Sequence, residues 1–381
     1  MDSTCNKKIV IATGLYPPDI GGPATYVRML EDMLPAHGID CVVVPFTEVR
    51  HLPKVVRHVV FFWRLLRSAR GADVVYALDP VSVGVPALVV SKLRLKPFLV
   101  RLGGDYAWEQ GQQRFGLTAM LDAYTADKKS APWQVRALAS MQRFVVCRAQ
   151  KVVVPSQYLK RIVATWGVTE SQLEVVHSAL FPLKVTESKQ AIRTAGGYTG
   201  TVLCSAARLT PWKGYDVLID VVHTLRTKFP DIVLLIAGDG PEEEHLKKQV
   251  QTLKAQAYII FTGRLSKAEL GKVLVSSDVF VLNTAYEGLS HQLLEVMNLG
   301  IPVVTTHVGG NPELITDGTT GLTVGYNNAE ALQQAITRML TDTALRTTVV
   351  ENGKQRTEDF NQDTVVTEFV TMLTTHIWQK I

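Results

Sequence analysis

Short apolar runs rich in valine and isoleucine alternate with helix-like segments along the whole chain, and this alternation limits the possible folds more than any other feature. Runs of this kind indicate strands buried on both faces, and strands separated by helices form parallel sheets. We therefore expect an α/β protein with two doubly wound sheets, one in each half. The expected strands of the first half are residues 8–13, 40–45, 72–78, 97–102, 151–156 and 173–178. Those of the second half are residues 201–207, 232–238, 257–263, 278–283, 301–306 and 321–325.

The length of 381 residues suits two domains, because single hydrophobic cores stop growing beyond about 250 to 300 residues. Residues 181–200 lose the periodic pattern and gain polar and glycine residues, so we place the hinge there. We expect Rossmann-like domains over residues 1–182 and 183–360. Residues 361–381 place apolar side chains near one face, which predicts a closing helix that crosses back to the first domain.

The composition is that of a soluble globular protein, with 46% hydrophobic and 20% charged residues. No run of about 18 uncharged apolar residues occurs, so we expect neither a signal peptide nor a spanning helix. Cys5, Cys41, Cys147 and Cys204 are scattered singly, a spacing that suggests neither a zinc site nor a disulfide framework. A reducing cytoplasm fits this pattern best.

A basic and apolar segment over residues 54–70 predicts a helix with one cationic side and one strongly apolar side. One interpretation is a surface helix that packs on its own domain and exposes its basic face to water. The other is a helix that docks on an anionic membrane. The chain has no nucleic-acid recognition motif or extended basic stripe, so we do not expect a nucleic-acid partner.

Open α/β sheets bind ligands beyond the carboxyl ends of their strands, so the loops there are the informative ones. After the first strand, Gly21 and Gly22 precede a helix that begins near Pro23, where a ligand anion could approach the backbone. A tight strand-to-helix turn is the alternative. In the second half, Arg208 and Lys213 flank a turn before another helix and could converge on phosphate oxygens. A solvated surface pair is the alternative there.

The stretch "EGLSHQLLE" places two carboxylates, Glu287 and Glu295, on either side of an expected helix start. The backbone amides of Gly288, Leu289 and Ser290 at that start suit a diphosphate, and the carboxylates could accept hydrogen bonds from sugar hydroxyls. The alternative is one loop charge and one ordinary charge on an amphipathic helix.

These motifs together resemble one known family. "EGLSHQLLE" is similar to the E-x7-E signature of the family 4 glycosyltransferases, which have the GT-B fold of two Rossmann-like domains facing each other across a cleft. The segments "ARLTPWKG", "IAGDGP", "FTGRLS" and "GIPVVTTHVGGNPELITDGTTGLTV" resemble further motifs of the family in the same order.

The resemblance implies a role for each matching position. Arg208 and Lys213 would neutralise the donor diphosphate, and Glu295 would hold the ribose. Glu287 would contact the hydroxyls of the transferred sugar, and the loop at Arg264 would read the base.

The resemblance also implies that Gly22 approaches the distal phosphate and that the amides of residues 288–290 bind near it. Enzymes of this kind commonly need no metal, because cations and helix dipoles replace it. We therefore expect no metal and no cofactor beyond a nucleotide-diphospho-sugar as co-substrate.

The chain departs from the family pattern in two places. Ser290 and Gln292 stand near positions where many members have glycine and proline. Gly103 stands where many members have a histidine, and Asp105 is the nearest polar substitute. We expect residues 103–132 to form the acceptor side, with Asp105 as a catalytic residue. A turn-forming aspartate is the alternative.

The implied activity is retaining transfer of a sugar to a saccharide or lipid-linked saccharide, in bacterial-type polysaccharide or glycolipid assembly. Residues 1–182 would bind the acceptor and residues 183–360 the donor. The expected location is cytoplasmic, with peripheral association at the inner face of the plasma membrane left open. The alternatives are a GT-B epimerase or phosphorylase, a catalytically silent subunit of a partner transferase, and a non-catalytic sugar-binding protein.

Overall fold

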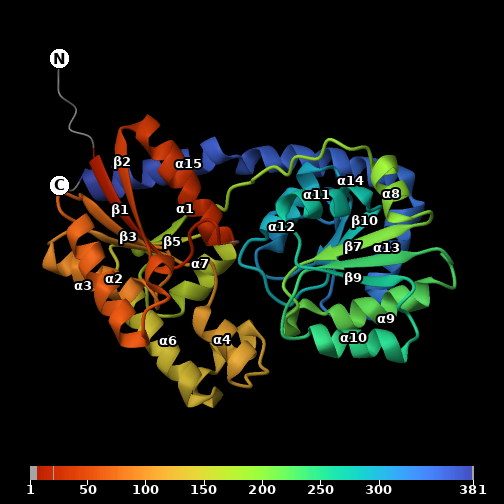
Figure 1. Cartoon of the computed structure of the whole chain (residues 1–381), viewed down its shortest axis with the longest axis horizontal. Helices are drawn as coiled ribbons and strands as arrows, with labels where there is room; N and C mark the ends of the chain where they lie inside the picture. Colours follow the sequence, from red (N-terminus) through yellow and green to blue (C-terminus); the bar gives the residue numbers. More distant parts are fainter. Residues whose placement is uncertain (1–6, 20, 380–381) are drawn as a thin grey trace. The chain divides into compact units, whose positions relative to one another are not determined.

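A computed structural model describes residues 7–19 and 21–379 of the chain (Figure 1). The chain forms two compact units. Unit 1 contains the residues up to Ala179 together with the segment that starts at Gln362, and unit 2 spans Leu180–Asn361. Each unit is described below by itself.

The sheet of unit 1 is parallel, with strand order β2-β1-β3-β4-β5-β6. Its central strands are buried on both faces, which explains their continuous runs of apolar residues. The strands are β1 (Lys7–Thr13), β2 (Ile39–Pro45), β3 (Val74–Ala77), β4 (Phe98–Arg101), β5 (Lys151–Val154) and β6 (Leu173–Val175).

Helices cover both faces of this sheet. Helix α1 links β1 to β2, whereas α2, α3 and α6 lead toward the other edge of the sheet, so right-handed crossovers place α1 and these three helices on opposite faces. On one face α1 contacts α15. On the other face α2 packs on α3, and α3 packs on α6. The helices are α1 (Gly22–Met33), α2 (Lys54–Ser68), α3 (Gly84–Leu93), α4 (Tyr106–Arg114), α5 (Leu121–Ala126), α6 (Trp133–Val146), α7 (Gln157–Ala164) and α15 (Gln362–Leu373).

The C-terminal helix α15 packs into the core of unit 1. The ring of its fully buried Phe369 stacks on Tyr76 of β3, with 5.2 Å between the ring centroids. Glu368 Oε2 accepts a hydrogen bond from the backbone N–H of His177 at 3.0 Å. Glu368 Oε1 lies 3.0 Å from the Nδ1 atom of the same histidine. Residues 362–373 are therefore part of the fold of unit 1.

Unit 2 repeats the architecture with a parallel sheet of order β12-β11-β10-β7-β8-β9. Its strands are β7 (Val202–Ala206), β8 (Val233–Ala237), β9 (Ile259–Gly263), β10 (Val279–Leu282), β11 (Val303–Thr306) and β12 (Leu322–Val324). Its helices are α8 (Lys189–Gly196), α9 (Tyr215–Leu225), α10 (Glu243–Thr252), α11 (Lys267–Ser276), α12 (His291–Asn298), α13 (Ala329–Thr341) and α14 (Thr343–Arg356).

The predicted α/β fold is confirmed, because a strand lies within every stretch where the sequence predicts one. The predicted basic helix is also present as α2. Residues 181–200, where we placed the hinge, include the short helix α8, which contacts α11 of unit 2. In the described part of the chain, no helix is long and apolar enough to cross a membrane.

Candidate functional site

The candidate site of unit 2 is built from the loops at the carboxyl ends of its strands. The loops after β7, β8 and β9 are tied together by backbone hydrogen bonds: the Gly238 N–H donates to the Gly263 carbonyl at 2.9 Å, and the Leu209 N–H donates to the Asp239 carbonyl at 2.8 Å. A Cβ on Gly238 would overlap the Ala207 carbonyl oxygen. This glycine therefore lets neighbouring loops approach each other.

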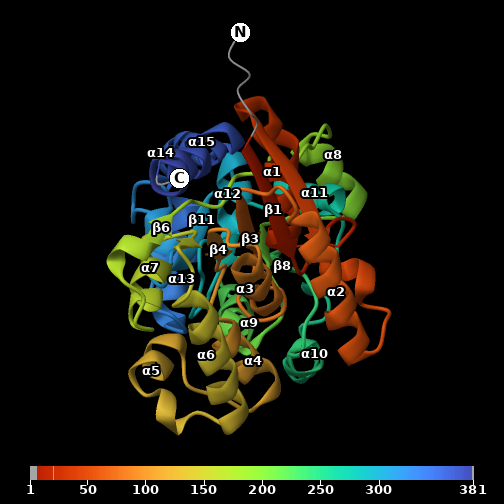
Figure 2. The same cartoon turned by 90° about the vertical axis from the view of Figure 1, so that its left-hand side faces the viewer.

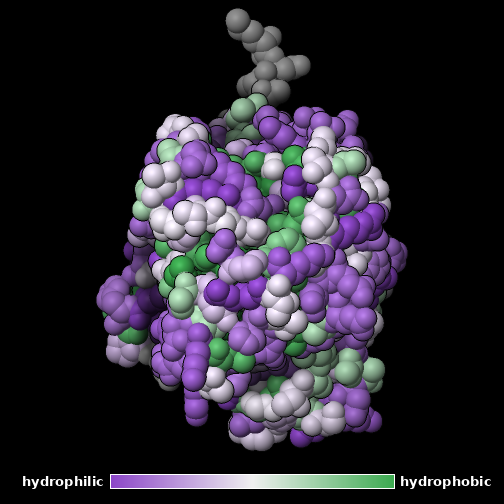
Figure 3. Space-filling view, turned by 90° about the vertical axis from the view of Figure 1, so that its right-hand side faces the viewer, coloured by the Kyte–Doolittle hydropathy of each residue, from purple (hydrophilic) through white to green (hydrophobic). Residues whose placement is uncertain are grey.

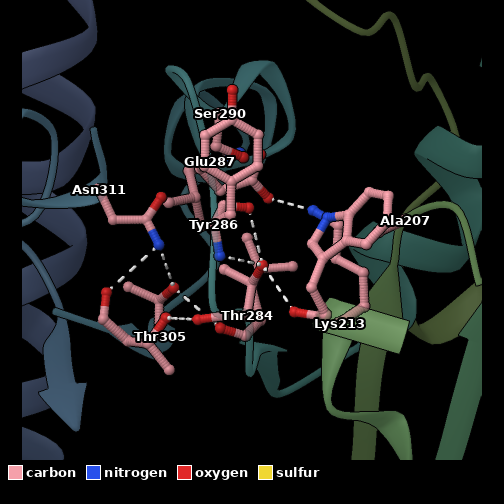
Figure 4. Close-up of polar contacts among 12 residues, drawn as sticks. Ala207, Lys213, Thr284, Tyr286, Glu287, Ser290, Thr305 and Asn311 are labelled. Atoms are coloured by element: carbon pink, nitrogen blue, oxygen red, sulfur yellow. Dashed lines mark hydrogen bonds and ion pairs between the residues drawn. The ribbon is translucent and has the colours of Figure 1, made fainter. Parts of the chain in front are cut away.

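Lys213 and Glu287 form an ion pair at this edge of the sheet (Figure 4). Lys213 ends the short 3-10 turn Pro211–Lys213 after β7, and Glu287 lies in the loop between β10 and α12. The two side chains are 10% and 16% exposed. Because an unpaired charge at such burial is costly, the pair stabilises both loops in this conformation.

Hydrogen bonds from buried polar side chains hold the Lys213 turn in place. Gly214 has a left-handed conformation with φ of 50°, and a Cβ there would overlap Asn283 and Asn327. The Asn283 Nδ2 group donates to the Gly214 carbonyl at 2.9 Å and to Asn327 Oδ1 at 2.8 Å. Thr284 Oγ1 donates to the Trp212 carbonyl at 3.3 Å. These contacts fix where the lysine can point.

The loop after β11 supports Glu287 from the other side. The Gly310 N–H donates to the Glu287 carbonyl at 2.9 Å. A Cβ on Gly309 would overlap the Glu287 carbonyl, and one on Gly310 would overlap the Gly288 carbonyl. Asn311 anchors this loop by donating to Thr305 Oγ1 at 3.2 Å (Figure 4). Both glycines are thus required for the close contact of the two loops.

A second ion pair joins helix α12 to helix α11. Ser290 caps this helix, and its hydroxyl oxygen accepts a hydrogen bond from the Leu293 N–H at 3.4 Å. Glu295 is 5% exposed and pairs with Lys267, the first residue of α11. Burial raises the pKa of Glu295, and the charge and hydrogen bond of Lys267 oppose that rise. No sequence motif pointed to Lys267, because only the packing of α11 brings it to Glu295.

The structure therefore places eight of the predicted donor-site residues on unit 2 in or next to these loops. Arg208 and Arg264 are exposed at the ends of β7 and β9, and neither forms an ion pair with another described residue. Gly288, Leu289 and Ser290 are buried at the start of α12. The roles assigned to all of these residues stay predictions.

The two remaining predicted residues lie in unit 1. Gly22 is the first residue of α1, as the sequence indicated. Asp105 is 1% exposed and caps α4, where its Oδ1 accepts hydrogen bonds from the Trp108 N–H and the Gln142 Nε2 group, both at 3.1 Å. Burial raises the pKa of Asp105, whereas these hydrogen bonds and the positive charge of Lys128 act to lower it. This setting suits a structural cap, and the catalytic role of Asp105 stays a prediction.

Two family models match the chain. The description "Glycosyl transferases group 1" belongs to the model that matches residues 189–356, and "Glycosyl transferase 4-like domain" to the one that matches residues 38–179. The first match contains all of the candidate site residues of unit 2, and the second contains Asp105.

Curated relatives are glycosyltransferases. The sulfoquinovosyl transferase SQD2 of Arabidopsis thaliana is 25% identical over 75% of this chain and 58% of that protein. A GDP-mannose-dependent monoacylated alpha-(1-6)-phosphatidylinositol monomannoside mannosyltransferase of Corynebacterium glutamicum is 24% identical over 93% of this chain and 94% of that protein. For the first three relatives, the matched region spans only 39% to 58% of the relative's length.

Solved structures share the fold. Anabaena Alr3699/HepE in complex with UDP has a TM-score of 0.76 at 18% identity, with 97% of this chain and 100% of that chain covered. Sucrose-phosphate synthase of Thermosynechococcus elongatus has a TM-score of 0.75 at 17% identity, with 97% and 98% covered. The predicted GT-B fold is therefore confirmed.

Proposed function

We propose that this chain, which belongs to the glycosyltransferases with the GT-B fold, transfers a sugar from a nucleotide-diphospho-sugar to an acceptor hydroxyl with retention of configuration. The acceptor we propose is a saccharide or lipid-linked saccharide used in polysaccharide or glycolipid assembly. The donor binds to unit 2 and the acceptor to unit 1.

The ion pair between Lys213 and Glu287 carries this proposal. Glu287 pairs with Lys213 at the end of the sheet where ligands of α/β proteins bind. A diphosphate offers Lys213 a stronger charge-assisted contact, and exposed Arg208 can add a second one. Release from Lys213 leaves the Glu287 carboxylate free to accept hydrogen bonds from hydroxyls of the sugar.

Similar proteins support a diphosphate ligand without fixing the base. Structures of Alr3699/HepE were solved with UDP and with UDP-glucose, whereas the related mannosyltransferases are named as GDP-mannose-dependent. The shared part of these donors is the diphosphate and the sugar. The lipid in the names of these mannosyltransferases supports a glycolipid acceptor for this chain.

The chemistry we propose depends on stabilisation of the leaving group. Negative charge develops on the departing diphosphate, and preorganised cations and backbone amides at the start of α12 can stabilise it. The departing phosphate then helps to remove the acceptor proton on the same face of the sugar, so the site needs no strong base. Lys213 and Arg208 take the place of a metal ion in this scheme.

Peripheral membrane binding is a further part of the proposal, and an apolar face of unit 1 supports it. Among the described residues, the exposed large apolar side chains all come from α2, α6 and α3 with its following turn. They include Trp63 of α2, 55% exposed, and Trp133 of α6, 68% exposed. The full set is Val55, Val56, Val59, Trp63, Val89, Leu93, Leu95, Trp133, Met141 and Phe144. We call this set the apolar face.

The helices that carry the apolar face are neighbours in space (Figure 2), and α3 contacts both α2 and α6. Their sequences contain arginine and lysine but no aspartate or glutamate. The face of unit 2 drawn in Figure 3 is by contrast mostly hydrophilic, with small apolar areas. Exposed apolar side chains on neighbouring helices that carry cations but no acidic residues suit an anionic lipid surface.

We predict that Lys213→Ala weakens binding of UDP or GDP far more than binding of uridine or guanosine. A lost charge-assisted contact costs roughly 1.5 to 3 kcal/mol, and only the diphosphates make that contact. Isothermal titration calorimetry measures both affinities, and Lys272→Ala, which removes a half-exposed lysine elsewhere in unit 2, is the matched control. Equal weakening of diphosphate and nucleoside would contradict the phosphate assignment.

Glu287→Gln should lower kcat at least about tenfold while the nucleoside diphosphate still binds, because the amide is a poorer acceptor for sugar hydroxyls. Steady-state kinetics together with calorimetry separate the two effects. A kcat equal to that of the unmodified chain would remove Glu287 from the sugar site.

The same assay decides the role of Asp105. If its carboxylate acts on the acceptor, Asp105→Asn lowers transfer at least about tenfold with donor affinity and folding preserved. If transfer is unchanged, Asp105 is only the cap of α4.

Activity should survive treatment with EDTA, because the scheme gives the diphosphate charge to lysine and arginine rather than to a metal. Sugar transfer is measured before and after the chelator is added. Loss of turnover that magnesium or manganese specifically restores would show this account of the diphosphate site to be wrong.

The chain should sediment with vesicles that contain phosphatidylglycerol but not with pure phosphatidylcholine vesicles, and high salt should release it. Charge reversal at Arg64 and Arg67 should lower binding at least about tenfold, since each cation near an anionic surface contributes about 1 kcal/mol. Charge reversal at Lys248 and Arg338 of unit 2 is the matched control. Vesicle binding that neither high salt nor charge reversal at Arg64 and Arg67 changes would refute membrane docking.

A further inference from the structure

A cavity of about 660 Å³ opens in unit 1 at the carboxyl ends of β1, β2 and β3. Loops after all three strands line it, together with α2 and α4. Its lining residues include Gly14 after β1, Phe46 and Arg50 after β2, and Asp79 after β3. Parallel α/β sheets bind ligands at this edge, so the position suits a substrate.

The charge in the cavity is mainly positive. Three arginines line it, Arg50, Arg57 and Arg114, against the single carboxylate of Asp79. Asp79 is already engaged: its Oδ1 accepts hydrogen bonds from the backbone N–H groups of Val81 at 2.8 Å and Ser82 at 2.5 Å. Asp79 therefore holds its own loop, and the lining has three guanidinium groups against one carboxylate.

Arg50 also has local partners. Its guanidinium lies 3.1 Å from Asp19 Oδ2 and donates to the Gly14 carbonyl at 2.6 Å. These contacts hold Arg50 beside the loop after β1. Because Asp19 partly neutralises the charge of Arg50, the preference of the cavity for a ligand depends mainly on Arg57 and Arg114.

Arg57 and Arg114 form no ion pair with another described residue. The guanidinium of Arg57 lies 5.7 Å from the ring centroid of Phe46, and its Nε is buried without a hydrogen-bond partner in the described part of the chain. Buried polar atoms in native proteins nearly always have a partner, so an unsatisfied arginine nitrogen that lines a cavity points to a missing acceptor. Arg114, in the last turn of α4, is exposed and free to reach a ligand.

We infer that this cavity binds a phosphate ester carried by the acceptor, through Arg57 and Arg114, and this inference rests on the proposed glycosyl transfer. Guanidinium groups match the oxygens of phosphate better than any other side chain does. Tyr106 and Ser82, which also line the cavity, supply hydroxyls that can hydrogen-bond to the sugar or alcohol part of the same molecule.

Helix α2 connects the cavity with the apolar face. It carries Arg57 in the cavity wall and Val55, Val59 and Trp63 on the apolar face. A phosphate in a lipid headgroup would reach the cavity beside a helix that touches the bilayer. A soluble sugar phosphate offers the same chemistry from solution, so the experiment contains both probes.

Calorimetric titrations of the full chain test the inference, with UDP or GDP present at saturation so that the donor site of unit 2 is filled. The probes are glucose 6-phosphate, water-soluble dihexanoyl phosphatidylglycerol, and glucose as the neutral reference. We expect at least one phosphate ester to bind and glucose to bind at least tenfold more weakly. Arg57→Gln and Arg114→Gln should each weaken the phosphate probe about tenfold or more, since each removes a charge-assisted hydrogen bond.

Two controls make the result specific. Arg161→Gln removes an exposed arginine of α7 outside the cavity and should leave probe affinity unchanged. Arg114→Lys retains the charge and should recover part of the affinity that Arg114→Gln loses, which a purely structural role would not produce. Tighter binding of the phosphatidylglycerol probe assigns a lipid source, and tighter binding of glucose 6-phosphate a soluble one.

Equal binding of glucose and the phosphate esters would overturn the inference, as would phosphate affinity that neither Arg57→Gln nor Arg114→Gln changes. The affinity for UDP or GDP is measured in a separate titration of the same chain without the phosphate probes. If neither nucleotide binds while the phosphate probes do, the donor proposal fails and the cavity proposal stands. If the nucleotide binds and the phosphate probes do not, the cavity proposal fails and the donor proposal stands.

Discussion

Both sheets are parallel, and the positions of all the candidate chemical groups depend on this constraint. In a parallel sheet every strand ends at the same edge, and both faces are covered by the helices that connect the strands. The loops at the carboxyl edge can change in sequence without disturbing the sheet, so they can carry chemical groups. Those loops are crowded, and glycines such as Gly238 and Gly310 are needed where one backbone packs against the next. The crowding leaves few conformations for each loop, which preorganises the side chains they carry.

The two ion pairs of unit 2 show how the site stays stable without a ligand. Lys213 with Glu287, and Lys267 with Glu295, place each carboxylate beside a cation, so no charge is buried alone. In the proposed function a donor diphosphate would compete with Glu287 for Lys213, and it would do so with more negative charge and more acceptor oxygens. Every anion that binds Lys213 would have to displace Glu287, so only a ligand with enough negative charge to offset that cost would bind there.

Much of the fold and part of the site could be predicted from sequence, because both depend on local patterns. Strands buried on both faces leave continuous apolar runs, and the loop with Glu287 follows such a run directly. The contacts of Lys267 could not be predicted, since they depend on the packing of α11 beside α12. The close packing at Gly238, within the segment "IAGDGP", could not be predicted either, because its missing side chain makes room for the Ala207 carbonyl of a different loop. Asp105 likewise acquired a buried partner, Gln142, from a helix more than 30 residues away in sequence.

Helix α2 of unit 1 has no acidic residue and exposes several apolar side chains, and both features need an explanation. A helix that only faces water usually mixes both signs of charge, because opposite charges at helical spacing stabilise it. Helix α2 instead pairs Arg64 with Glu48 from outside the helix and leaves Trp63 half exposed. Burying one such aromatic side chain contributes about 1.5 to 3 kcal/mol, and several together with nearby cations are enough for reversible attachment to an anionic surface. Because Arg57 of the same helix lines the cavity, attachment to a bilayer would bring the phosphate-binding groups to the level at which lipid phosphates lie.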